Sequence, residues 1–169
     1  KAIVAKHSPK GFSFGSALME DEDHGSVVMP SHYAGLRKVF DGWQLTGNVA
    51  GLAQVEEHYK KLSAKFGYTV LPPEAMMNLF GYQLVALGKM DEALSVFKYN
   101  VKTYPESANV YDSLAELYEK NGKLDLAKPN YARAVELGVQ TNDPNMPVYK
   151  TNLDRVSETL KKTAEAKGK

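Results

Sequence analysis

The feature that most constrains this chain is an internal repeat with a period of 34 residues. When the sequence from Met77 onward is compared with the sequence 34 residues further on, large apolar residues align with large apolar residues and small with small. The aligned pairs are Met77–Tyr111, Phe80–Leu114, Gly81–Ala115, Leu84–Tyr118, Gly88–Gly122, Ala93–Ala127 and Phe97–Tyr131. Self-similarity at such a period predicts stacked copies of one supersecondary unit.

Each copy has the pattern of a helix hairpin. Apolar residues recur at three-four spacing on both sides of Gly88 and of Gly122, which indicates two amphipathic helices per copy. The two glycines fall where a tight connection requires positive φ. Small residues at Gly81 and Ala115 would let the paired helices approach closely. The predicted fold class is therefore all-α, a stack of helix hairpins.

The two copies resemble the tetratricopeptide repeat. The first, residues 74–107, carries at the positions of that pattern Met77, Phe80, Gly81, Leu84, Ala93, Phe97, Asn100 and Pro105. The second, residues 108–141, carries Tyr111, Leu114, Ala115, Tyr118, Ala127, Tyr131 and Ala134. It departs from the pattern at Val139, where the closing proline is expected, and at Pro129, which lies early in a helix where a missing N–H costs little. The resemblance implies a superhelix of hairpins.

The repeats need neighbours, because each hairpin buries its apolar face only on the next one. We expect flanking helices at residues 52–66 and 148–164 to form the end layers, so that the predicted helical domain covers residues 46–169. Residues 1–45 read differently. "GFSFGSALM", residues 11–19, alternates like a strand; an acidic loop follows, and a helix begins near Pro30.

The segment "EDEDHGSVVMPSHYAGLRKVF" resembles the C-terminal end of an esterase family of α/β-hydrolases that includes enzymes acting on siderophore lactones. The residues that carry the resemblance are Glu22, His24, Gly25, Ser26, Val27, Tyr33, Gly35, Leu36 and Phe40. It implies that residues 1–45 are the last strand, loop and helix of a hydrolase domain and that His24 is its triad base. Because the triad histidine comes last in α/β-hydrolases, the serine and the acid would lie outside this chain. The chain itself would not be catalytic, and the parent protein would be a serine esterase.

Other interpretations of this segment need no esterase. A run of charges is ordinarily a solvated loop. "GFSFG" matches G-x-S-x-G around Ser13, but the strand-like alternation continues beyond the serine where the motif needs a helix. His24 and the acids before it could attract a divalent ion, yet consecutive loop residues cannot all face one ion and the calcium-loop spacing is absent. We therefore expect no metal and no cofactor.

The repeat resemblance also implies a binding surface on the concave side of the superhelix. The corresponding residues are Asn78, Tyr82, Asn109, Asp112, Glu116 and Lys120. This set leans acidic, so a bound protein or peptide would carry Lys or Arg. Alternatively, the face packs against the hydrolase domain or another subunit. The rival overall interpretation is a free-standing repeat scaffold with no relation to hydrolases.

Composition narrows the partners further. Lys and Arg number 21 against 20 Asp and Glu, which gives no electrostatic reason to expect nucleic acid. No apolar stretch reaches the length of a membrane span. The sequence contains no cysteine, which excludes disulfides and cysteine nucleophiles but leaves the compartment open.

Overall fold

The computed structural model describes residues 14–167, and its regular secondary structure in that range is entirely helical. The helices are α2 (Val28–Val39), α3 (Leu52–Phe66), α4 (Glu74–Ala86), α5 (Met90–Thr103), α6 (Ala108–Lys120), α7 (Leu124–Thr141) and α8 (Met146–Lys167). The chain divides into two compact units, Lys1–Gln44 and Leu45–Lys169, which are described separately below. None of the described helices is long and apolar enough to cross a membrane.

In the first unit, the predicted strand over residues 11–19 is wrong for its described part. Residues 14–19 form no strand, and residues 11–13 lie outside the described residues. A strand requires a partner for its backbone hydrogen bonds, and an alternating pattern alone does not supply one. Turns then lead into α2, which starts at Val28, two residues ahead of the predicted start near Pro30. None of the twelve residues of α2 is buried.

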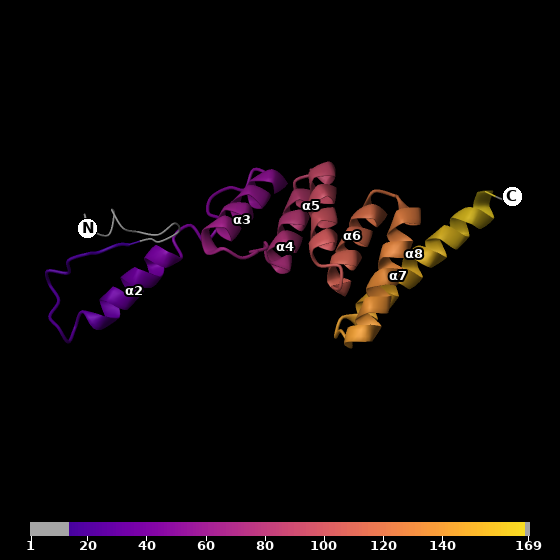
Figure 1. The fold of residues 1–169 in the computed structure, drawn as a ribbon. Coiled ribbons are helices and arrows are strands. Elements are labelled where there is room, and N and C mark those ends of the chain that lie inside the picture. Colours follow the sequence, from indigo (N-terminus) through magenta and orange to yellow (C-terminus); the bar gives the residue numbers. More distant parts are fainter. Residues whose placement is uncertain (1–13, 168–169) are drawn as a thin grey trace. The chain divides into compact units, whose positions relative to one another are not determined.

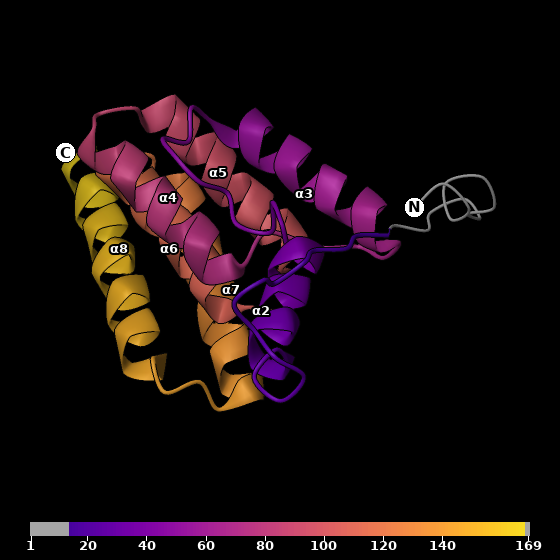
Figure 2. The ribbon, with the colours of Figure 1, turned by 90° about the vertical axis from the view of Figure 1, so that its left-hand side faces the viewer.

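In the second unit, the predicted stack of hairpins is confirmed (Figures 1 and 2). Helices α4 and α5 pair as one hairpin and α6 and α7 as the next, and α5 packs against α6. Gly88 and Gly122 close the two turns with φ of 74° and 69°. In both, the residue after the glycine donates its N–H to a carbonyl five positions back, Lys89 to Leu84 and Lys123 to Tyr118, each at 2.9 Å. The two turns therefore repeat in atomic detail, as the sequence period predicts.

The core repeats with the same period. Met77, Ala93 and Phe97 are at most 1% exposed in the first hairpin, and Ala115, Ala127 and Tyr131 are fully buried in the second. Gly81 lies so close to the Phe97 ring that an added Cβ would stand 2.6 Å from a ring carbon. The small residues in the repeat thus set how closely the paired helices approach.

Helices at both ends extend the stack. α3 packs on α5, and α8 packs on α7. α7 runs for 18 residues and passes through Val139, where the repeat pattern would place a proline, before Asn142 ends it with φ of 52°. Tyr149 and Val156 then anchor α8, each at most 2% exposed.

Candidate functional site: a polar face on α4, α6 and α8

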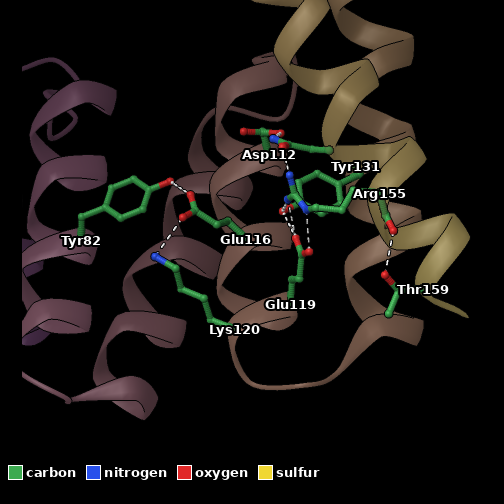
Figure 3. Close-up of polar contacts among 9 residues, drawn as sticks. Tyr82, Asp112, Glu116, Glu119, Lys120, Tyr131, Arg155 and Thr159 are labelled. Atoms are coloured by element: carbon green, nitrogen blue, oxygen red, sulfur yellow. Dashed lines mark hydrogen bonds and ion pairs between the residues drawn. The ribbon is translucent and has the colours of Figure 1, made fainter. Parts of the chain in front are cut away.

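A network of polar side chains joins helices α4, α6 and α8, which are the first helices of successive layers (Figure 3). On α4, the Tyr82 hydroxyl donates a 2.7 Å hydrogen bond to Oε2 of Glu116 on α6, at the equivalent position 34 residues later. The other oxygen of Glu116 forms a 2.9 Å ion pair with Lys120. Burial alone would raise the pKa of the Glu116 carboxyl, but the hydrogen bonds from Tyr82 and Lys120 hold it below its usual value. Three of the predicted site residues therefore contact one another.

Asp112 is the second carboxylate on this face of α6. Its Oδ1 accepts a 2.9 Å hydrogen bond from Nδ2 of Asn152 on α8. Across residues 14–167 no Lys or Arg forms an ion pair with it. Burial raises the pKa of Asp112, and the nearby charges of Glu116 and Glu119 add to that effect. Asp112 is thus a partly buried negative charge whose printed partner is a neutral amide.

Asn78 on α4 occupies the position equivalent to Asp112, 34 residues earlier. Its Oδ1 is buried and accepts no hydrogen bond from the described residues. Burying a carbonyl oxygen without a partner costs on the order of 1–3 kcal/mol. Equivalent positions of the two repeats therefore both present oxygen acceptors that lack a strong donor.

Asn109, the remaining predicted residue, serves within the stack. Its Nδ2 donates a 3.0 Å hydrogen bond to Oε1 of Glu74 at the start of α4. This contact links the beginnings of α4 and α6. A ligand would have to compete with Glu74 for this amide.

Sequence reasoning missed a cluster around Glu119. Arg155 of α8 donates two hydrogen bonds to this carboxylate, from Nε to Oε1 at 2.9 Å and from Nη2 to Oε2 at 2.7 Å. The Tyr131 hydroxyl donates a third, at 2.7 Å. The hydrogen bonds from Arg155 are the largest of the effects that lower the pKa of Glu119. Arg155 and Asn152 lie beyond the second repeat, so the period carried no signal for them.

His24 in the first unit is exposed within a turn. The turn is held by Asp23, whose Oδ1 accepts hydrogen bonds from the backbone N–H groups of Gly25 at 2.7 Å and Ser26 at 2.8 Å. These bonds, with Ser26 first, lower the pKa of Asp23. The described residues give His24 no printed hydrogen-bond partner, and Ser13 lies outside them. The role of His24 as a triad base therefore stays a prediction.

Comparisons with known proteins return likeness of structure alone. No protein-family model matches the chain, and no curated protein matches it. The crystal structure of PcrH from Pseudomonas aeruginosa matches with a TM-score of 0.47 and 17% identity, over 83% of this chain and 96% of that chain. PcrH with the chaperone binding region of PopB gives a TM-score of 0.41 and 16% identity, over 83% and 96% of the two chains. PcrH with the chaperone binding region of PopD gives 0.41 and 14%, over 89% and 99%.

Proposed function

We propose that the second unit is a protein-interaction module that binds a peptide segment through the polar face formed by Asn78, Tyr82, Asp112, Glu116 and Asn152. The observation that carries this proposal is Asp112, a partly buried carboxylate without an ion-pair partner among the described residues. A carboxylate held in such a place becomes more favourable when a cation is brought to it. A lysine or arginine side chain of a partner is the group that supplies this charge.

The neighbouring groups determine which part of a peptide fits. Glu116 and Glu119 already hold Lys120 and Arg155, so their charges are compensated within the stack. Asp112 is not, and it is therefore the specificity residue of the face. The unpaired Oδ1 of Asn78 provides an acceptor for a backbone N–H or a side-chain amide of the same peptide.

The test uses an array of synthetic 12-residue peptides synthesised in matched sets with Lys, Ala or Glu at one position. Binding is measured by fluorescence anisotropy at two salt concentrations. We expect the lysine peptides to bind best and to lose affinity with salt. Asp112→Asn, which keeps the shape and removes the charge, should weaken lysine-peptide binding about tenfold, a difference of about 1.4 kcal/mol.

Asp125→Asn is the matched control, because it makes the same chemical change at an exposed position in the first turn of α7. It should leave peptide affinity unchanged. Equal binding of lysine and glutamate peptides, or wild-type affinity in Asp112→Asn, would contradict the proposal.

The finer prediction, that this module belongs to a serine esterase, receives no support from the comparisons. The free-standing scaffold accounts for the hairpin stack and the polar face without it. The esterase prediction has a separate test in the coding sequence upstream of Lys1, which must then contain G-x-S-x-G between a strand and a helix.

A further inference from the structure

One side of α4 is open where the same side of α6 is covered. On α6, Val110, Ser113 and Leu117 are 0%, 2% and 1% exposed, because the preceding hairpin packs on them. The α4 residues 34 positions earlier are Met76, Leu79 and Gln83; Leu79 is 60% exposed, and Gln83 is exposed too. α3 supplies the second helix of a preceding layer, since it packs on α5. The first helix of that layer is replaced by the extended segment 45–50.

This replacement leaves an apolar groove of about 550 Å³, here called the α4 groove. Its lining includes Leu45, Val49, Val55, Met76, Leu79 and Leu87. Leu87, at the end of α4, is 71% exposed. The lining residues of α4 recur at positions 76, 80, 83 and 87, the three-four spacing that forms a ridge and its adjoining groove for another helix.

α2 is a helix of suitable size and character that buries nothing. Its twelve residues compare with thirteen in α4 and in α6. Met29, Tyr33 and Leu36 lie on one face at four- and three-residue spacing and are 76%, 64% and 59% exposed. An apolar helix face of this kind marks an interaction site in a folded protein.

We propose that the α4 groove is filled by α2 of a second copy of this chain. Every copy carries both an uncovered helix and an uncovered groove, so two copies satisfy each other by exchanging α2. The exchange is reciprocal and closes about a two-fold axis, which yields a dimer and no further growth. One short helix in one groove is small beside the roughly 1,200 Å² of a specific interface, and reciprocity doubles the contact.

The first test is the mass of the full chain in solution, measured by analytical ultracentrifugation over a concentration series. The wild type should dimerise. Leu36→Glu on α2 and Leu87→Glu at the α4 groove should each weaken dimerisation at least tenfold, since each places a charge in the apolar contact. Leu126→Glu, at a 46% exposed leucine of α7, is the control and should dimerise normally. A monomeric wild type, or equal loss in all three variants, would overturn the proposal.

The second test separates exchange between copies from docking within one copy. The sequence contains no cysteine, so Leu36→Cys and Leu87→Cys each introduce a single thiol. When the two single variants are mixed and oxidised, a disulfide-linked heterodimer should form, at a level well above either variant oxidised alone. In the double variant, a cross-link confined to single chains would show that α2 fills its own groove and would overturn the exchange. Wild-type circular dichroism of each variant confirms that it folds.

Discussion

At the scale of single residues, the closest contact in the stack is between Gly81 and the ring of Phe97. A methyl group at residue 81 would stand 2.6 Å from a buried aromatic ring that is 1% exposed and enclosed by the core. At Gly138 the nearest atom to an added methyl is the Met146 sulfur, at 2.5 Å. A thioether at the end of a flexible side chain can move aside, whereas an enclosed ring cannot.

Gly81→Ala should therefore lower the free energy of unfolding by about 1–3 kcal/mol through overpacking. Gly138→Ala should cost less, because Met146 can adopt another rotamer while both substitutions gain the same helix propensity. Urea denaturation followed by circular dichroism gives the two values. A Gly138→Ala variant less stable than Gly81→Ala would show that the ring at Phe97 is free to move.

At the scale of elements, the first helices of successive layers are linked by charged and polar side chains as well as by the core. Tyr82 joins α4 to α6, and Arg155 joins α8 to α6 through Glu119. The period predicted the helices, the turns and the core, because those depend on residue size at repeated positions. It could not predict the Glu119–Arg155 contact, since α8 follows the second repeat after a differently built connection.

Glu119→Gln should destabilise the chain at neutral pH by about 1 kcal/mol, since a charged bidentate contact becomes neutral. The folded-state pKa of Glu119 lies below its ordinary value, so its contribution is full above the unfolded pKa and disappears as pH falls through the folded pKa. The difference between variant and wild type, measured by denaturation at several pH values, should accordingly shrink in acid.

Asp112→Asn provides the opposite sign within the same helix. Because burial raises the pKa of Asp112, its charged form costs stability at neutral pH, and that cost is relieved as pH falls through the raised pKa. The variant should be more stable than wild type near pH 7 and lose this advantage in acid. Parallel pH profiles for the two variants would contradict the assignment of these charges.

At the scale of the whole molecule, the chain consists of two units that divide between Gln44 and Leu45. The second unit has the large buried core, while α2 in the first has no buried residue. The alternating pattern at residues 14–19 failed as a strand prediction because pairing depends on a neighbouring strand, which a local pattern does not specify. The face of α2 likewise reads as amphipathic in the sequence, but only the structure shows that it is uncovered.

Limited digestion with proteinase K should cut first between Phe40 and Gly51. The segment contains Gly42 and Gly47, both at positive φ, and lies outside the regular helices. A fragment that begins near Leu45 should survive and keep the helical circular dichroism of the stack. Mass spectrometry identifies the cut sites, and early cleavage inside residues 74–141 would contradict this order.

The repeated turn at Gly88 and Gly122 has a mechanical consequence. Because each hairpin holds mainly to its immediate neighbours, a chain pulled from its two ends would give way one hairpin at a time rather than all at once. Each rupture would release 34 residues, the spacing of the two turns, or roughly 110–120 Å of contour length at full extension. The stack is in that sense a spring that lengthens in equal steps.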